Sequence, residues 1–383
     1  MTEALDKLHA ARAQFPVTRN RIYLDTANTG SPPTCVTQTL AAYFARQQDD
    51  GGDKKGAVTA VEITRAKAAA LLGCDAAEIA FVKNTSEGLN IAAQAIDWRD
   101  GDNVVIPSRE HPNNVFPWLN LRRRGVEVRM APEGGDWVDA DMLCPYVDAR
   151  TRVVAVADVS FAPGQRNDLA GIAALCHAVG AYLVVDGVQA VGLLTVRVRD
   201  LGVAMWAASG HKGLMTPHGL GLFYCRRDLI SGLSPAYTAR ASMMPGLGDD
   251  HLVLNPDIPL CDDARRFEIG NHNYAGVQAM GAALDLIGGI GIATIEQHVL
   301  GLGEYLTELL AERQIARVGP QDPRRRSSIC VFALPGEGWV EYFAARGIIV
   351  SGRLGAIRVS IGLHNSRNEI DRFVAALDER LDR

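Results

Sequence analysis

A lysine and an aspartate stand at positions that favour one kind of chemistry. Asp186 ends the apolar run AYLVVD (181–186), and Lys212 follows the next apolar run in ASGHKG (208–213). A lysine amine can form a Schiff base with pyridoxal phosphate, while a carboxylate can pair with the pyridinium nitrogen and keep it protonated, so that the ring accepts electrons. The pair therefore predicts a pyridoxal 5'-phosphate site.

The surroundings of Lys212 favour burial. The residue lies between VAMWAAS (203–209) and the glycine-rich GLMTPHGLG (213–221), and desolvation lowers the pKa of a lysine toward the range that imine formation needs. The alternatives are an ordinary surface lysine and an aspartate that only starts a turn. Gln189, close behind Asp186, could donate to the phenolic oxygen of the cofactor, which favours the functional interpretation.

A phosphate site is predicted upstream. The segment FVKNTSEGLN (81–90) has the pattern of a strand that turns into a helix. Backbone amides at the start of a helix, with hydroxyls beside them, bind anions. Thr85 and Ser86 are the expected phosphate ligands. The alternative is that they only cap the helix.

The elements that must position these residues alternate along the chain. Apolar strand-like runs alternate with helical patterns from about residue 77 to residue 225, which is typical of an α/β fold with a mainly parallel sheet covered by helices on both faces. The expected strands span 78–82, 103–107, 126–131, 152–159, 181–186, 203–209 and 219–225. The expected helices between them span 86–96, 113–124 and 169–180.

At 383 residues the chain fits a large domain with a smaller appendage. We expect an N-terminal arm at 1–20, a large cofactor-binding domain at 21–273, connecting helices at 274–315 and a small α+β domain at 316–383. The region 226–273 is rich in Gly, Pro, Asp and Met and is expected to form long loops that shape a binding site.

Composition excludes several classes of function. The chain has 48% hydrophobic and 22% charged residues, and its formal charge of −5 offers no electrostatic reason for a nucleic-acid or anionic-membrane partner. The N-terminus lacks a secretory signal and no run resembles a membrane span, so a cytoplasmic location is expected. Seven scattered cysteines without a CxxC pair favour neither disulfides nor a metal site.

Several segments together resemble aminotransferase class V, a family of fold-type I pyridoxal phosphate enzymes that includes cysteine desulfurases, isopenicillin N epimerase and carbon–sulfur lyases. The resemblance runs from IYLDTANTG near residue 22 to RVSIGLHNSRNEIDRF near residue 373. It implies a large domain with a mainly parallel seven-stranded sheet and a small C-terminal α+β domain.

The resemblance also implies roles for individual residues around the cofactor. REHPNNVFPW (109–118) is similar to the family segment whose histidine stacks on the cofactor ring, which is His111 here, with Asn114 as a weaker substrate contact. The SGHK motif implies that Ser209 and His211 contact the phosphate.

Two further motifs lie toward the C-terminus. RRFEIGNHNYAG (265–276) is similar to a segment that reaches the phosphate of the neighbouring subunit, with Asn271 in place of the usual threonine, so a homodimer with a shared active site is expected. Arg358 matches the arginine that binds the substrate carboxylate in bidentate fashion. Thr29 is expected near the substrate, and Arg353 at the entrance.

The chain departs from cysteine desulfurases, which carry a nucleophilic cysteine on a loop just before the carboxylate-binding arginine. Here that stretch, IIVSGRLGAIRV (348–359), is short and has no cysteine, and Phe161 replaces a polar residue. We therefore expect a lyase of secondary metabolism that acts on an L-amino acid through an external aldimine and a quinonoid, as a carbon–sulfur β-lyase on a cysteine S-conjugate. Epimerisation and transamination stay open. A desulfurase is less favoured, and Lys212, Asp186 and Arg358 together argue against a non-catalytic binding protein.

Overall fold

The computed structural model describes residues 2–132, 137–244, 259–353 and 355–381. Part of the predicted loop region, residues 245–258, therefore lies outside the described residues. The segments on either side of it contain α9 (Arg227–Ile230) and two short 3₁₀ turns, Arg240–Ser242 and Ala264–Phe267, as well as loops.

A seven-stranded sheet forms the centre of the large domain, in the order β2-β8-β7-β6-β5-β3-β4. Its strands are β2 (Ile79–Val82), β3 (Asn103–Pro107), β4 (Glu127–Ala131), β5 (Thr151–Ala157), β6 (Tyr182–Asp186), β7 (Met205–Ser209) and β8 (Gly221–Cys225). Of these strands, β8 runs antiparallel to both of its neighbours, while the pairs from β7 to β4 are parallel. The predicted α/β fold with a mainly parallel seven-stranded sheet is confirmed, and each strand begins and ends within two residues of its predicted bounds.

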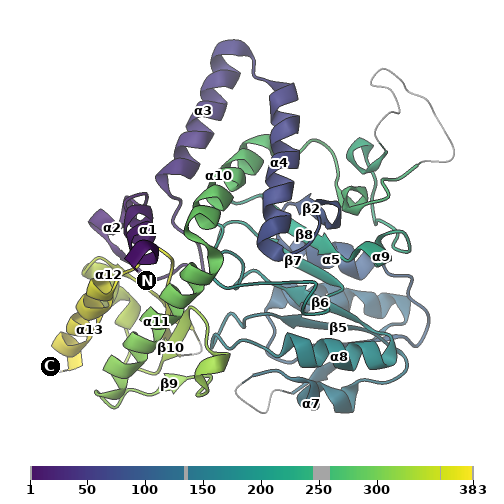
Figure 1. Ribbon diagram of the computed structural model, residues 1–383. Helices are drawn as coiled ribbons and strands as arrows, with labels where there is room; N and C mark the ends of the chain where they lie inside the picture. The colour runs from purple at the N-terminus through teal and green to yellow at the C-terminus, as the bar shows by residue number, and fades with distance from the viewer. Residues whose placement is uncertain (1, 133–136, 245–258, 354, 382–383) are drawn as a thin grey trace.

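Both faces of the sheet are buried, which explains why its strands are continuously apolar. On β6, Leu183 and Val185 belong to the same hydrophobic cluster as residues of α8 (Leu169–Val179). Val184, between them, belongs to the cluster that contains residues of α5 (Thr85–Ala95). Successive side chains of a strand point to opposite faces, so α8 and α5 cover opposite faces, as Figure 1 shows.

The predicted helix at 113–124 is wrong as a single element. The chain there forms a 3₁₀ turn (Pro112–Asn114), the short helix α6 (Phe116–Leu119) and a second 3₁₀ turn (Asn120–Arg124). Proline has no N–H to donate to a preceding turn, and Pro117 stands in the first turn of α6. Pro112 and Pro117 each stand in the first turn of a new short element, so one continuous helix does not form.

Two long helices have no counterpart among the predicted elements. α3 (Thr34–Asp50) and α4 (Lys54–Leu72) form a hairpin that packs on α10 (Tyr274–Ile290) and projects from the molecule (Figure 1). The turn between them is favoured locally, because the Asp53 side chain accepts from Gly56 N and caps α4. α3 has only Val36 fully buried, so it lacks the apolar stripe that marks an amphipathic helix.

A buried ion pair holds α4 against the sheet. Arg65 donates to Glu268 at 2.6 Å, and both side chains are only 2% exposed. Glu268 also accepts from the backbone N–H of Phe81 on β2 at 2.7 Å. The pair therefore connects α4, β2 and the RFE segment at one buried point.

The small domain is α+β and includes the start of the chain. Its four-stranded antiparallel sheet has the order β12-β13-β10-β9, with β9 (Arg317–Val318), β10 (Ile329–Phe332), β12 (Ser351–Arg353) and β13 (Ala356–Ser360). Its helices are α11 (Ile292–Ala311), α12 (Trp339–Ala345) and α13 (Arg367–Leu381), and α1 (Thr2–Arg12) and α2 (Val17–Asn20) lie beside them (Figure 1). The short helix α7 (Ala140–Leu143) belongs to the large domain, where it packs on α8.

The N-terminal segment crosses one of the predicted domain limits. β1 (Ile22–Tyr23) pairs in parallel with β11 (Ile348–Ile349), and Asp25 forms a bridge with Ser360. Residues 22–25, predicted in the large domain, therefore pair with strands near the C-terminus. The three boundaries between the four predicted segments stay a prediction.

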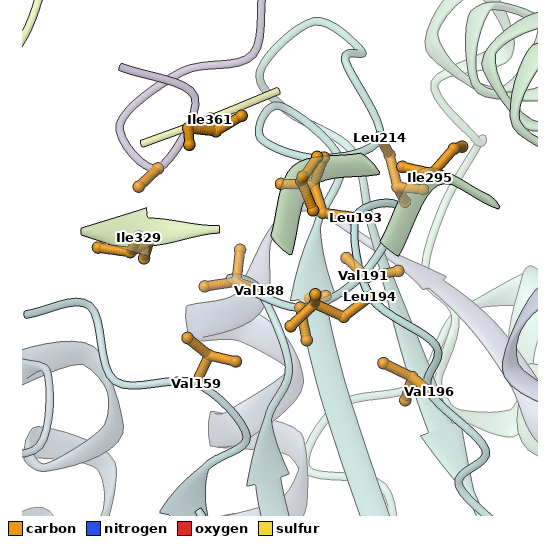
Figure 2. Packing of buried hydrophobic residues seen from close by; sticks show 14 of the residues in the cluster. Val159, Val188, Val191, Leu193, Leu194, Val196, Leu214, Ile295, Ile329 and Ile361 are labelled. Atoms are coloured by element: carbon orange, nitrogen blue, oxygen red, sulfur yellow. The ribbon is translucent and has the colours of Figure 1, made fainter. Parts of the chain in front are cut away.

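A shared hydrophobic cluster lies where the two domains meet. Figure 2 shows Val188, Val191 and Leu194, from the segment after β6, near Ile329 and Ile361 of the small domain. These side chains are nearly or fully inaccessible to solvent. Packing of this kind holds the small domain beside the carboxyl ends of the central strands.

No single helix among the described residues is long and apolar enough to cross a bilayer. α10 and α11 satisfy the criterion of length and composition only as a pair, and they are bent by 79°.

Candidate active site

The carboxyl ends of the central strands border a cavity of about 270 Å³. Parallel strands bring their carboxyl ends to the same edge of a sheet, where α/β proteins bind ligands. Residues from segments far apart in sequence meet there. Those predicted from the sequence are Thr85, Ser86, His111, Asp186, Gln189, Ser209, His211 and Lys212.

One end of the cavity has the hydroxyl groups that an anion requires. Thr85 N donates to Ser209 Oγ at 2.8 Å, Ser209 N donates to Thr85 Oγ1 at 2.9 Å, and the two hydroxyls are 2.9 Å apart. One hydroxyl donates to the other, so the second keeps its proton for a ligand. Because both residues adjoin the N-terminus of α5, where the helix dipole favours negative charge, this end suits a phosphate group.

His211 lines the same cavity, and its own imidazole is neutral. Its ring stacks on that of His218 with centroids 4.1 Å apart. Burial, together with the charges of the nearby His218 and Lys212, lowers the pKa of His211 to about 4. A neutral ring keeps one N–H donor and one acceptor, so His211 is able to donate to a phosphate oxygen.

Asp186 is a buried carboxylate that lacks a strong cationic partner. One carboxylate oxygen accepts from Val188 N at 3.1 Å, and no ion pair reaches Asp186 within the described residues. Burial raises its pKa, whereas the Val188 N–H and the charge of Lys212 oppose that rise. A cation placed beside this carboxylate would be stabilised, and a protonated pyridine nitrogen is such a cation. Gln189 donates one amide N–H to the carbonyl of Ala27 at 3.1 Å and keeps a second donor.

Lys212 has the electrostatics of a reactive amine. Its pKa is lowered to about 8, chiefly by burial; the charges of Arg358 and Arg353 also lower it, while those of Asp186 and Asp25 raise it. At that pKa roughly a fifth of the amine is neutral near pH 7.4, whereas an ordinary lysine is almost fully protonated there. The neutral amine is the form that attacks a carbonyl carbon.

His111 lies beside the cavity in a partly buried position. Its ring meets that of Phe161 edge to face, with centroids 5.0 Å apart, and its Nδ1 accepts from Asn113 N at 3.1 Å. Burial lowers the pKa of His111, and the charges of Lys212 and Arg353 act in the same direction. The ring is therefore neutral at physiological pH.

Arg358 is 1% exposed and does not line the cavity directly, but its charge lowers the pKa of Lys212, so the two lie near each other. Arg353 is half-buried and donates to the carbonyl of Gly352 at 2.7 Å. Its charge lowers the pKa of His111, of Lys212 and of Arg358. Both arginines predicted to face the substrate are therefore on the Lys212 side of the small domain.

Three other predicted residues lie away from this cavity. The substrate contact predicted for Asn114 is not supported, because the residue is fully buried, its amide donates to Glu110 at 3.1 Å, and its oxygen accepts from Trp118 at 3.4 Å. Thr29 does not line the cavity, whereas its neighbour Asn28 does. Asn271 is exposed on the surface of its own subunit, so its predicted phosphate contact stays a prediction.

Gly30 is a residue of this site that the sequence patterns did not indicate. Its N–H donates to the carbonyl of His211 at 2.8 Å, and a Cβ at this position would lie 2.0 Å from the carbonyl oxygen of Lys212. The N-terminal loop therefore packs directly against the backbone of Lys212. The glycine in LDTANTG was the available signal, but its partner lies far away in sequence.

The cavity fits pyridoxal phosphate. A hydroxyl-rich helix N-terminus, a buried carboxylate that favours a cation and a lysine amine with a lowered pKa all open into one space. These are the partners of the phosphate, the ring nitrogen and the aldehyde, respectively. Thr85, Ser209 and His211 would hold the phosphate, and Lys212 would hold the aldehyde carbon.

Comparisons with known proteins agree with this chemistry. The chain is 37% identical to a probable cysteine desulfurase of Methanothermobacter thermautotrophicus over 304 residues, which cover 77% of this chain and 74% of that protein. It superposes on the apo structure of a cysteine desulfurase from Thermococcus onnurineus NA1 with a TM-score of 0.87 and 26% identity, covering 98% of each chain.

A further solved structure shares the fold. The cystine C–S lyase C-DES, in complex with its reaction product cysteine persulfide, superposes with a TM-score of 0.86 at 22% identity, over 95% of this chain and 99% of that one. The family model Aminotransferase class-V matches residues 22–373, nearly the whole chain. The chain therefore belongs to the aminotransferase class V family and is a pyridoxal phosphate-dependent enzyme.

Proposed function

We propose that this enzyme is a carbon–sulfur β-lyase that acts on a cysteine S-conjugate. The observation that carries the proposal is the position of the cysteines. All seven lie within the described residues, and none of them lines the cavity that holds Lys212 and Asp186. A carbon–sulfur bond broken here must therefore break without attack by a thiol of this chain.

The loop where desulfurases carry their cysteine supports the same conclusion. Only residues 354 and 355 connect β12 to β13, just before Arg358. Cys330, in the neighbouring strand β10, is inaccessible to solvent, and burial raises the pKa of its thiol. A buried thiol with a raised pKa is a poor nucleophile.

Each residue of the site has a separate role in the proposed elimination. When bound, pyridoxal phosphate withdraws electrons from the α-carbon of the substrate, so that the α-proton becomes acidic. Lys212 then accepts the α-proton on Nζ, for which its lowered pKa suits it. Asp186 keeps the proton on the ring nitrogen, and Arg358 orients the substrate through its α-carboxylate.

The overall reaction balances without an external oxidant. The bond between the β-carbon and sulfur breaks, sulfur leaves with the electron pair, and a proton converts it to a thiol. Water then supplies the oxygen of pyruvate as ammonia is released. The proton that converts the sulfur to a thiol is the one that Lys212 Nζ has accepted from the α-carbon, because neutral His111, beside Phe161 at the cavity, is too weak an acid to supply it.

The test uses the cofactor-loaded enzyme and a thioether of cysteine with a bulky S-substituent. We expect thiol and pyruvate in equal amounts, with Lys212→Ala as the inactive control. Alanine with sulfane sulfur from cysteine would instead show the activity for which several relatives are named. Conversion of a keto acid to an amino acid would show transamination, and solvent deuterium at an otherwise unchanged α-carbon would show epimerisation. Any of these three results without thiol release contradicts the proposal.

We also propose that the enzyme is a homodimer whose active site includes Asn271 of the second copy. Support comes from the exposure of Asn271 and from the absence of this residue from the cavity of its own subunit. Light scattering should give twice the monomer mass, and Asn271→Ala should weaken cofactor binding. A monomer with full cofactor affinity would contradict the proposal.

A further inference from the structure

Arg358 is held by three segments that are far apart in the sequence. Its Nε donates to Ser351 Oγ at 3.1 Å, its Nη1 donates to the carbonyl of Phe161 at 3.0 Å, and its Nη2 donates to Asp25 Oδ1 at 3.3 Å. The Ser351 hydroxyl in turn donates to the same Asp25 oxygen at 2.9 Å. Asp25, Ser351 and Arg358 thus form a closed triangle of hydrogen bonds.

The remaining hydrogens of Arg358 suit a carboxylate. A guanidinium has five N–H groups in one plane, and the three contacts above use one on each nitrogen. The two that remain are one on Nη1 and one on Nη2. A carboxylate accepts such a pair in bidentate fashion, so the protein contacts leave free the end of the fork that a substrate requires.

Asp25 is itself rigidly placed. It is 6% exposed, and directly after β1 its backbone forms a parallel bridge with Ser360. The following backbone is held as well, because Ala27 N donates to Ser360 Oγ at 2.9 Å and Gly30 N donates to the carbonyl of His211. The same short loop therefore contacts both Arg358 and the backbone beside Lys212.

We propose that Asp25 is a positioning residue, which aims the two remaining N–H groups of Arg358 at the α-carboxylate of an amino acid held at Lys212. The inference rests on the substrate-binding role proposed above for Arg358. The geometry gives Asp25 two means of fixing the guanidinium: a direct contact with Nη2 and the shared Ser351 hydroxyl. A carboxylate that only neutralised a buried arginine would have no need of the hydroxyl.

The experiment measures binding rather than turnover. Cofactor-loaded enzyme is titrated with L-alanine and, separately, with ethylamine, and the dissociation constants are taken from the change in the visible absorption of the cofactor. The two probes share an amine, but only L-alanine has a carboxylate. Neither has a leaving group on the β-carbon, so the result does not depend on whether the enzyme is a lyase.

Asp25→Ala should raise the dissociation constant of L-alanine about tenfold, the effect of one lost hydrogen bond to a charged group. The dissociation constant of ethylamine should change by less than about twofold, because the amine does not contact Arg358. Asp25→Asn keeps an acceptor oxygen and should restore L-alanine binding to within about threefold of the wild type. Asp378→Ala, which breaks a surface pair with Arg313, is the matched control and should change neither constant.

Ser351→Ala provides an independent test if Asp25→Ala does not fold, because it removes only a neutral hydroxyl. It should weaken L-alanine binding by about threefold and leave ethylamine binding unchanged. The proposal is overturned if L-alanine binds Asp25→Ala as tightly as it binds the wild type, or if both probes weaken equally. If Asp25→Ala does not fold, the proposal is overturned when Ser351→Ala binds L-alanine as tightly as the wild type does.

Discussion

Gly30→Ala should disable Lys212 without touching any side chain that does chemistry. A Cβ at position 30 would lie 2.0 Å from the carbonyl oxygen of Lys212, whereas real Cβ atoms essentially never approach within 3.0 Å of another heavy atom. The two backbones must therefore separate by at least about 1 Å. A misplacement of about 1 Å costs roughly 100-fold in rate when reacting groups must be aligned. The backbone of Gly30 itself is not strained, since its φ lies outside the left-handed region.

The assay compares kcat/KM for thiol release by the wild type and Gly30→Ala, together with the absorption band of the bound cofactor and the melting temperature. Gly288→Ala is the matched control, because that glycine lies in α10 with nothing within 4 Å of the added Cβ. The control should be stabilised by about 0.5–1 kcal/mol and remain fully active. Wild-type kcat/KM in Gly30→Ala would refute the reasoning, since it would mean that the contact with Lys212 does not position the amine.

Three further predictions concern charge. The rate at which the apoenzyme binds pyridoxal phosphate through Lys212 should rise with pH and level off above about pH 8. The neutral amine is the form that attacks, and the pKa of Lys212 is lowered to about 8. Stopped-flow absorbance measures this rate, and a rise that continues toward pH 10 would contradict the prediction. Arg358→Lys should raise KM for the amino acid by roughly tenfold, with a smaller effect on kcat, since an ammonium cannot form the bidentate pair. Glu268→Ala should lower the free energy of unfolding by about 3 kcal/mol, because it removes the buried partner of Arg65 and leaves only Glu62, whose side chain is 53% exposed, as an ion-pair partner; denaturant titration would measure this, and a loss below about 1 kcal/mol would contradict it.

Much of the fold follows from local pattern. The strands of the central sheet are short apolar runs bounded by polar or glycine-rich segments, so their positions are visible without any tertiary contact. α3 and α4 were not visible in this way, because α3 buries almost nothing and has no clear apolar stripe. The region 113–124 has a helical composition but does not form one helix, because Pro112 directly precedes it and Pro117 interrupts it.

The cofactor end of the site was also predictable, because its chemistry resides in short motifs at strand ends. Thr85, Asp186 and Ser209 each stand at the end of a strand or the start of the helix that follows, and parallel strands bring such positions together. Asn114 shows the limit of this reasoning. Its motif places it near the cavity, but the 3₁₀ turn directs its amide to Glu110 and Trp118.

By itself, the sequence determined the α/β class, the lysine predicted to form the Schiff base and the absence of a cysteine beside Arg358, because each depends on residue type and on periodicity over a few residues. Only the tertiary structure decided what surrounds that lysine. Gly30 against the Lys212 backbone and Asp25 against Arg358 are contacts between segments that lie far apart in the sequence. The folded chain also buries Lys212, and this burial is the main reason that its pKa is lowered to about 8. Burial depends on the packing of the whole chain, and no local pattern contains it.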